Sequence, residues 1–515
     1  MRGTVIASLS VAMQPCESPK PANLQEALEL VDSMAITIRL QSLKIDQLTR
    51  RLFGPTSEKL PLEDNQLPLL DQDSSEPPVT LDVLIEKEAV DQPERKPRAS
   101  RQPVAKDLEV VEERLEPEQK VCPHCGKERC VIREEASEKY DFIPARLICR
   151  RTIRPVLACS SCKDGVVQAP MPASIAPKRM CSEGLIAHVV LQKYLEHRPL
   201  YRQQQEFLRL GATISRTVLS DAMETAAVAL QPLWKLIRDG LTQADYLQVD
   251  ETPVSVLDPE VVGKAAQGYL WVYHRPGGDV LFDYQPGRSR AGPLEILKEF
   301  TGTLQSDGFK VYETLGNLHP GWKRLGCMAH SRRKFHEALK DDPQRAKWFL
   351  LQMGALYRVE RALRESKASP EQRFVRRQAE AVPVLTEIRA QLEVLNPQKP
   401  GAKVLPQSPL GKAVRYALSQ WEYLIGYVED GRYEIDQNLV ENAIRPSCVG
   451  KRNWLFIGHP DAGWRSAVLY TLILNCTRRG IDPWDWMTDV FRRLPATTNF
   501  TVAELLPANW KKSAD

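Results

Sequence analysis

The sequence has no apolar run of the roughly 18 residues that a membrane-spanning helix needs, and runs such as LIAHVVL and YTLIL are much shorter. It also lacks an excess of one charge, because 70 basic residues stand against 66 acidic ones and the formal net charge is +4. A uniformly basic coat for a polyanion is therefore excluded, although local basic patches are not. The 515 residues suggest about three domains of roughly 150 residues each.

Cysteine is scarce and odd in number, with eleven residues, and four of them sit in close Cys-x-x-Cys pairs. Such pairs are typical of thiolates that are kept reduced for metal binding, so we expect a cytoplasmic protein. The first fifteen residues resemble a signal peptide only faintly, because two serines dilute their apolar centre.

The N-terminal region, 20–60, has the apolar spacing of a coiled coil. From Leu24 to Leu52 apolar residues recur in alternating steps of three and four, which amounts to about four heptads. Self-association of protomers is the favoured interpretation, and an amphipathic helix lying on the protein's own body is the alternative. The Pro- and acid-rich stretch 61–118 that follows is typical of a flexible linker.

Two cysteine pairs in the region 119–178 predict a zinc-binding module. The pairs are Cys122 with Cys125 in CPHC, and Cys159 with Cys162 in CSSC, with 33 residues between them. Four thiolates complete a tetrahedral zinc site and leave no open position, so this zinc is expected to be structural rather than catalytic. Disulfides or free thiols are the alternative, and they suit neither the spacing nor the expected compartment.

The region 179–243 is expected to be mostly helical. Within it, an apolar helix, a turn at Gly211 and a second helix opening at Ser215 resemble a helix-turn-helix in their spacing. Ser215, Arg216 and Thr217 would then begin a DNA-recognition helix. Many helical hairpins share this spacing, so simple packing remains the alternative.

Beyond residue 244 the pattern changes to strands and predicts a mixed α/β sheet. The expected strands lie in ADYLQVDETPV, GYLWVYHR, VLFDYQ, GTLQSDG and KRLGCMAH, with a helix in GPLEILKEF. Asp250 and Asp307 each end a strand, two residues after a glutamine. If those strands are neighbours, the two carboxylates converge, and such a pair suits Mg²⁺. The alternative is two ordinary aspartates at strand ends.

A third candidate carboxylate lies in YEIDQNLVENAIRPSCVGKRNWLFIG. The segment from Asp436 to Arg445 is expected to be helical and to stop before Pro446. Glu441 projects away from the apolar side of this helix, either to pair with Arg445 or to join the two aspartates. Several residues are candidates to hold DNA phosphates or to stack on a base: Arg445, Lys451, Arg452, Asn453 and Trp454.

Several of these motifs resemble those of the insertion-sequence-66 family of bacterial transposases. The resemblance rests on VDETPV, LQSDGFKVYE, CMAHSRRKF and IDQNLVENAIRPSCVGKRNWLFIG, and extends to RLFGPTSEKL, CPHCG, EHRPLYRQ and LLPANW. It covers almost the whole chain. It implies a multidomain α+β protein with an RNase H-like catalytic domain of the DDE type at 244–480, a helical insertion at about 332–427 and a C-terminal tail at 481–515.

The resemblance also implies an activity. Asp250, Asp307 and Glu441 would be the catalytic residues and would hold two Mg²⁺ or Mn²⁺ ions for phosphodiester cleavage and strand transfer. The implied partners are terminal inverted repeats, target DNA, a second protomer and small accessory proteins of the same element, with the protein nucleoid-associated when bound to DNA. Cys327 and His330 match a Cys-x-x-His signature of related transposases, for which a structural or substrate-positioning role is preferred to metal ligation. The alternative functions are an inactive DNA-binding regulator or decayed copy, and a zinc-scaffolded interaction protein whose acidic residues are purely structural.

Overall fold

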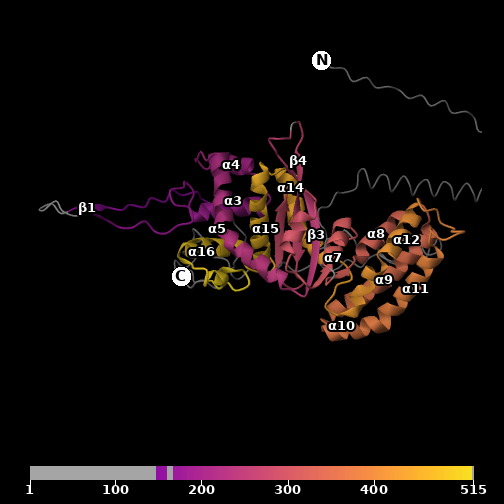
Figure 1. Ribbon diagram of the computed structural model, residues 1–515. Coiled ribbons are helices and arrows are strands. Elements are labelled where there is room, and N and C mark those ends of the chain that lie inside the picture. Colours follow the sequence, from indigo (N-terminus) through magenta and orange to yellow (C-terminus); the bar gives the residue numbers. More distant parts are fainter. Residues whose placement is uncertain (1–145, 159–165, 262, 320, 513–515) are drawn as a thin grey trace, which may run out of the picture. The chain divides into compact units, whose positions relative to one another are not determined.

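The computed structural model describes residues 146–158, 166–261, 263–319 and 321–512. The predicted coiled coil, the linker and the four cysteines of the predicted zinc site lie outside these residues. The described part is a mixed α+β structure with a central five-stranded sheet (Figure 1), which confirms the predicted class. No helix in the described ranges is long and apolar enough to cross a membrane.

A short hairpin precedes the main body. Its strands β1 (Val156–Ala158) and β2 (Val166–Gln168) pair in antiparallel register. Two side-chain bonds hold its base together: Arg154 Nη1 donates to the Ala169 carbonyl at 2.9 Å, and Gln168 Nε2 donates to the Arg154 carbonyl at 3.1 Å. The hairpin therefore brackets, in the sequence, the segment that contains Cys159 and Cys162.

The central sheet contains the five strands that alternation predicts. Their order is β5-β4-β3-β6-β7, with β3, β4 and β5 antiparallel to one another and β6 and β7 added in parallel to β3. The β4–β5 turn includes Gly277, whose φ of +75° suits glycine. The strands are β3 (Tyr246–Val256), β4 (Ala266–His274), β5 (Val280–Gln285), β6 (Thr303–Gln305) and β7 (Lys323–Leu325).

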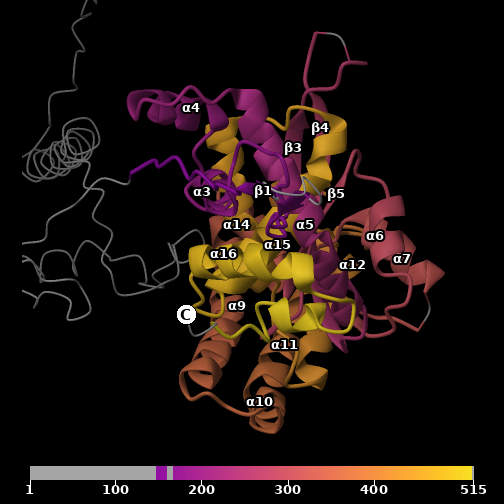
Figure 2. The same cartoon turned by 90° about the vertical axis from the view of Figure 1, so that its left-hand side faces the viewer.

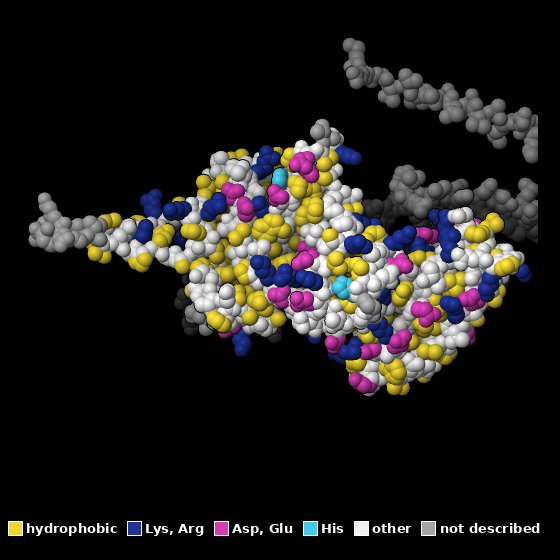
Figure 3. Space-filling view, viewed as in Figure 1, with side chains coloured by type: hydrophobic (Ala, Val, Ile, Leu, Met, Phe, Trp, Pro, Cys, Tyr) yellow, Lys and Arg dark blue, Asp and Glu magenta, His cyan; other side chains and the backbone are white. Residues whose placement is uncertain are grey.

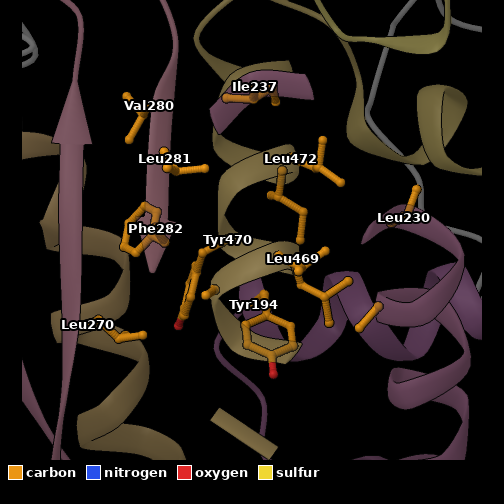
Figure 4. Packing of buried hydrophobic residues seen from close by; sticks show 14 of the residues in the cluster. Tyr194, Leu230, Ile237, Leu270, Val280, Leu281, Phe282, Leu469, Tyr470 and Leu472 are labelled. Carbon is orange, nitrogen blue, oxygen red and sulfur yellow. The ribbon is translucent and has the colours of Figure 1, made fainter. Parts of the chain in front are cut away.

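Helices from both ends of the described chain pack with the sheet. The expected helical region contains α3 (Glu183–Tyr194), α4 (Leu200–Arg209) and α5 (Arg216–Thr242). Two short helices flank β6: α6 (Ala291–Ile296) and α7 (Lys310–Leu318). Three helices follow the last strand: α14 (Asn438–Trp454), α15 (Gly463–Thr477) and α16 (Pro483–Arg493). Figure 4 shows the apolar side chains between β5, α15 and the N-terminal helices, where Phe282 stacks on Tyr470.

The outer strand β5 is closed off by helical side chains. The Val280 N–H donates to Asn475 Oδ1 at 3.1 Å, and Asn475 Nδ2 donates back to the Val280 carbonyl at 2.7 Å. The Phe282 N–H donates to Thr471 Oγ1, and its carbonyl accepts from Trp234 Nε1, both at 2.9 Å. Because these backbone groups are satisfied by α15 and α5, this edge of the sheet is not open to pairing with another chain.

The segment 481–515, expected to be a tail, instead contributes α16 and residues as far as Trp510 to the core. Trp486, Met487 and Phe491 of α16 are fully buried, and Trp486 Nε1 donates to the Leu505 carbonyl at 3.0 Å. The physical reason is the helical spacing of the apolar residues in WDWMTDVF, which gives α16 one face to bury. The expectation of a tail was wrong.

The long stretch between β7 and α14 is helical and has an apolar core of its own, which includes Phe335, Phe349, Leu385 and Ile388. Figure 2 shows α9, α10 and α11 grouped together. The elements are α8 (Met328–Ala338), α9 (Pro343–Glu365), α10 (Pro370–Arg376), the π-helical turn η1 (Arg377–Ala381), α11 (Val382–Val394), α12 (Pro409–Ser419), α13 (Trp421–Ile425) and the 3₁₀ turn η2 (Gly426–Glu429).

A buried ion pair holds this helical region to the segment that leads into α14. Arg377 and Glu360 are both fully buried, and two N–H groups of Arg377 meet the two carboxylate oxygens at 2.7 and 2.8 Å. Arg377 also donates to the carbonyls of Tyr427, Asp430 and Tyr433 at 2.9–3.0 Å. A buried pair of this kind is stable only when its remaining polar atoms are also satisfied, as they are here.

Replacing Arg377 with methionine should lower the free energy of unfolding by about 3 kcal/mol, because Glu360 loses its main partner while still buried. We place the loss at this level because Arg373 keeps one contact with Glu360 at 3.2 Å. Urea unfolding of the full chain measures it. Arg376→Met is the matched control, because the ion pair between Arg376 and Glu380 is exposed. Its loss should change the free energy of unfolding by less than about 1 kcal/mol. Equal stability of the two variants would contradict the prediction.

Candidate active site

The two candidate aspartates extend from neighbouring strands. Strands β3 and β6 are parallel, and Gln248 pairs in register with Gln305. Asp250 and Asp307 each lie two residues beyond their glutamine, so the alternation of a strand directs both toward the same face. Asp307 follows the end of β6, but Asp250 does not end its strand as expected, because β3 continues to Val256 in antiparallel pairing with β4. The condition for the two carboxylates to converge, that their strands are neighbours, is therefore met.

Glu441 reaches the same place from α14. It lies in the first turn of this helix, and its charge raises the pKa of Asp250. Burial raises the pKa of Asp250 well above its usual range, and the charges of Glu251, Glu441 and Asp307 raise it further. Burial also raises the pKa of Glu441, with Asp307 contributing in the same direction. The three carboxyl groups are therefore electrostatically coupled.

Asp307 differs from Asp250 in having cations nearby. Burial raises its pKa, while a hydrogen bond from the Phe309 N–H at 2.9 Å and the charges of Arg288 and Lys334 lower it. At Asp250 the opposing influence is the hydrogen bond that its Oδ1 accepts from the Glu251 N–H, also at 2.9 Å. Of the two aspartates, Asp250 is therefore the one whose charged form the protein itself stabilises less.

The carboxylate of Glu251, the neighbour of Asp250, is bound by other side chains. Its side chain is only 2% exposed, and it accepts from Arg288 Nε at 2.8 Å and from the Tyr312 hydroxyl at 2.5 Å. Because successive side chains of a strand point to opposite faces, Glu251 lies away from the face that carries Asp250. The structure therefore distinguishes between two adjacent acids that the sequence presents side by side.

A pair of buried glutamines fixes this arrangement. Gln248 Nε2 donates to Gln305 Oε1 at 2.9 Å and to the Asp436 carbonyl at 3.0 Å, and Gln248 Oε1 accepts from the Val440 N–H at 3.3 Å. Gln305 Nε2 donates to the carbonyls of Gly326 and Glu434 at 2.8 and 2.9 Å. Both glutamines are fully buried. Their bonds tie both strands to the segment that begins α14, which carries Glu441.

The Cys-x-x-His segment packs against this same start of α14. Cys327 Sγ accepts from the Gln437 N–H at 3.5 Å, and the Met328 N–H donates to the Ile435 carbonyl at 3.1 Å. His330 Nδ1 lies 3.9 Å from Glu441 Oε1. Burial raises the pKa of the Cys327 thiol well above its usual range and lowers the pKa of His330 to about 4, so the imidazole is neutral at pH 7.

The residues predicted for the recognition helix begin α5. Ser215 is the N-cap, and its Oγ accepts from the Val218 N–H at 3.3 Å. Arg216 and Thr217 are exposed beside it. The turn between α4 and α5 contains Gly211 with φ of +87°, as a tight helix-to-helix turn requires. DNA contact by these residues stays a prediction.

The expected end of the last site helix was wrong. α14 does not stop before Pro446 but continues to Trp454. A proline inside a helix lacks the N–H that would bond to the carbonyl four residues earlier. That carbonyl belongs to Asn442, which is exposed, so water can satisfy it and the helix continues.

This continuation changes the environment of the candidate DNA-binding residues. Lys451 Nζ donates to Thr252 Oγ1 at 2.7 Å and to the Pro253 carbonyl at 2.8 Å, so it ties α14 to β3. Trp454 is only 8% exposed and is not open to stacking on a base. Arg452 and Asn453 are exposed. Arg445 is half-buried, and its charge lowers the pKa of Glu441.

The structure adds basic residues that the sequence pattern did not single out. A hollow of about 760 Å³ in the helical region is lined by Lys334, Arg389, Lys412 and Arg415, with Glu393 among the other lining residues. The charge of Lys334 lowers the pKa of Asp307, so one lining residue of the hollow lies within electrostatic reach of that carboxylate. Figure 3 shows Lys and Arg side chains over α8 and α12. Lysines and arginines on exposed helix faces are too common for sequence alone to select these four.

Fold and site together define an α+β protein with three coupled carboxylates beside the paired strands β3 and β6. A family model described as "Transposase IS66 family" matches residues 178–465. Two further models match upstream: "zinc-finger binding domain of transposase IS66" at 119–163 and "Transposase C of IS166 homeodomain" at 41–112. The chain belongs to the IS66 family of transposases, and its zinc-finger match supports a structural zinc.

Relatives in Sinorhizobium fredii match over most of their length. One, named "Uncharacterized protein y4jD", is 32% identical over 95% of this chain and 97% of the relative. Another, "Uncharacterized protein y4qI", is 32% identical over 91% of this chain and 88% of the relative. Family membership therefore extends over nearly the whole chain.

The raised pKa of Asp250 predicts an unusual effect on stability. In the unfolded chain this carboxyl ionises near its ordinary pKa, so at neutral pH folding must accommodate a buried charge. Asp250→Asn should therefore raise the melting temperature of the metal-free protein at pH 8 by about 2 °C or more. The gain should shrink as the pH falls toward the folded-state pKa, because the wild type then binds a proton.

Thermal unfolding between pH 5 and pH 8 in a chelating buffer measures this effect. Asp341→Asn, at an exposed aspartate, is the control and should leave the melting temperature nearly unchanged throughout. A lower melting temperature of Asp250→Asn than of wild type at pH 8 would show that Asp250 is satisfied by a partner in the metal-free protein.

Proposed function

We propose that this protein is a DNA transposase that cleaves and joins phosphodiester bonds at Asp250, Asp307 and Glu441. The observation that carries the proposal is the electrostatic coupling of three partly buried carboxyl groups from β3, the end of β6 and the first turn of α14. Buried like charges of this kind are costly unless a cation neutralises them, and perturbed carboxylates cluster at functional sites.

The donor set suits a hard divalent ion. Carboxylate oxygens are the ligands that Mg²⁺ and Mn²⁺ prefer, and Asp250 has burial and three neighbouring carboxylates acting on its pKa. Asp250, Asp307 and Glu441 would hold two such ions. When bound, the ions would supply an activated water or 3′-hydroxyl and stabilise the leaving oxygen.

The protein's own residues would provide rigidity and orientation. Asp250 is fixed within a strand, and the glutamine pair holds the start of α14 against that strand, so Glu441 has little freedom to move. Glu251 is withdrawn by Arg288 and Tyr312, which leaves one acid of the adjacent pair for the site. Preorganisation of this kind is what positioning of a phosphodiester requires.

The strand order supports a DDE-type, RNase H-like catalytic domain. Three antiparallel strands are followed by two parallel ones, and the two aspartates extend from the adjacent strands β3 and β6. The helical stretch between β7 and α14 then takes the place of the insertion before the third carboxylate.

The basic hollow gives the proposed substrate a place to bind. Lys334, whose charge acts on Asp307, lines this hollow together with Lys412 and Arg415, and lysine and arginine contacts to phosphates dominate DNA affinity. The exposed residues Arg216 and Arg452 would extend these contacts elsewhere on the DNA.

The N-terminal regions would recognise and pair the DNA ends. Cys122, Cys125, Cys159 and Cys162 would hold a structural zinc in a module that binds the terminal inverted repeats together with the helices from 179 to 243. The segment 20–60 would pair protomers as a coiled coil. Small accessory proteins of the same element would be further partners, and the protein would act in the cytoplasm at the nucleoid.

Asp250→Asn, Asp307→Asn and Glu441→Gln should each reduce cleavage and strand transfer by at least about a hundredfold, because each removes a charged ligand worth several kcal/mol. The assay is Mg²⁺- or Mn²⁺-dependent cleavage of DNA carrying the element's ends, with DNA binding measured in parallel. Binding should persist in all three variants.

Glu337→Gln, at an exposed acid of α8, is the matched control and should cleave like wild type. Retained cleavage by any one of the three variants would remove that residue from the site. Absence of cleavage in wild type, both in the purified system and in cells carrying the whole element, would favour a DNA-binding regulator instead.

Cys122→Ser should release the structural zinc and weaken binding to the DNA ends, while the catalytic domain stays folded. Metal analysis and binding assays on the full chain measure the two effects, and circular dichroism checks the fold. Cys149→Ser is the control, since Cys149 is a free, exposed cysteine outside the Cys-x-x-Cys pairs. Zinc content equal in both variants would argue against Cys122 as a ligand.

A further inference from the structure

Three metal-ligating side chains of different chemistry meet beside the carboxylates. Cys327, His330 and Glu441 each place one ligand atom within 4.8 Å of the other two. Cys327 precedes α8, His330 lies in its first turn, and Glu441 comes from the first turn of α14. The bonds of Cys327 and Met328 to the segment 435–437 hold these two helix starts together.

Two of the ligand atoms lack a partner. His330 Nδ1 and Glu441 Oε1 are both buried, and neither has a hydrogen-bond partner among the described residues. They lie 3.9 Å apart, which is too long for a hydrogen bond. It is about half an ångström longer than the roughly 3.4 Å that separates two ligand atoms at a tetrahedral ion with bonds of about 2.1 Å, a difference that a small side-chain rotation closes. The separation therefore suits two ligands of one ion.

The third ligand is prepared in the way that metal-binding cysteines are. Cys327 Sγ accepts a hydrogen bond from the Gln437 N–H, and the main chain of His330 bonds to it as well. Burial favours the neutral thiol in the metal-free protein, so an ion bound here would displace the thiol proton, and the main-chain N–H groups directed at the sulfur would help to hold the resulting thiolate. A thiolate and a carboxylate together carry two negative charges, which balance a divalent ion next to the cations Arg333 and Lys334.

We propose that Cys327, His330 and Glu441 form a second metal site that takes a borderline-soft divalent ion such as Zn²⁺. Sulfur and imidazole ligands favour zinc over magnesium, and three protein ligands leave one position for water. Glu441 also belongs to the proposed carboxylate site. An ion bound here withdraws that carboxylate from the DNA-cleaving centre, so the site is inhibitory.

Zinc content of the full chain tests the site without any activity measurement. Wild type, Cys327→Ser, His330→Asn and Glu441→Gln are loaded with Zn²⁺, dialysed against metal-free buffer and analysed for zinc per chain. Cys476→Ser is the matched control, because Cys476 is another buried free cysteine but lies in α15. Circular dichroism confirms that each variant is folded.

We expect the three variants to hold one zinc ion fewer than wild type and Cys476→Ser. When Co²⁺ is loaded instead of Zn²⁺, the sulfur-to-cobalt absorption should decrease in Cys327→Ser and stay unchanged in Cys476→Ser. This difference does not depend on how many ions the N-terminal module binds. Equal zinc content in all five proteins would overturn the proposal.

The inhibitory effect rests on the proposed function and needs a separate assay. In the DNA cleavage reaction, rising Zn²⁺ at constant Mg²⁺ should suppress wild-type activity at least tenfold, and more Mg²⁺ should restore it. If the three variants hold one zinc ion fewer than wild type but cleavage is insensitive to zinc, the metal site stands and its inhibitory role is overturned. If the variants hold one zinc ion fewer than wild type but no cleavage occurs in any condition, the result counts against the proposed function instead of against the metal site.

Discussion

The candidate active site depends on the hydrogen bonds of two buried glutamines, Gln248 and Gln305. A fully buried amide must find partners for its N–H and carbonyl groups, and these two find them in each other and in the main chain at Gly326, Glu434 and Asp436. Those bonds join strands β3 and β6 to the start of α14. Because the three carboxylates lie within a few residues of these contacts, their positions follow from the glutamine pair.

The helical stretch between β7 and α14 contributes to the same arrangement. Arg377, paired with Glu360, holds the carbonyl of Tyr433, and the Tyr357 hydroxyl donates to Asp436 Oδ2 at 2.9 Å. Asp436 in turn accepts from the Asn438 N–H at 3.1 Å at the beginning of α14. The insertion therefore orders the segment that delivers Glu441, in addition to placing Lys334 within electrostatic reach of Asp307.

Much of the fold was accessible from sequence because its signals are local. Strand alternation, the glycine turn near Gly277 and the helix that opens at Ser215 depend on residues close together in the chain, and these predictions were confirmed. The errors arose where a local rule was outweighed by tertiary context. Pro446 did not end α14, because solvent satisfies the carbonyl that it leaves open, and Trp454 was drawn into the core rather than left for DNA.

The sequence by itself determined the family, the helices and strands, and the repeated Gln-x-Asp pattern that nominates two aspartates. Only the tertiary structure decided which acids act together, because it directs Asp250 toward Asp307 and Glu441 and binds the adjacent Glu251 to Arg288 and Tyr312 on the other face of the strand. It likewise brought Cys327 and His330 to Glu441 across more than a hundred residues of chain. The physical reason is that charge coupling and shared ligation depend on distance in space, which the pairing of β3 with β6 and the packing of α14 establish.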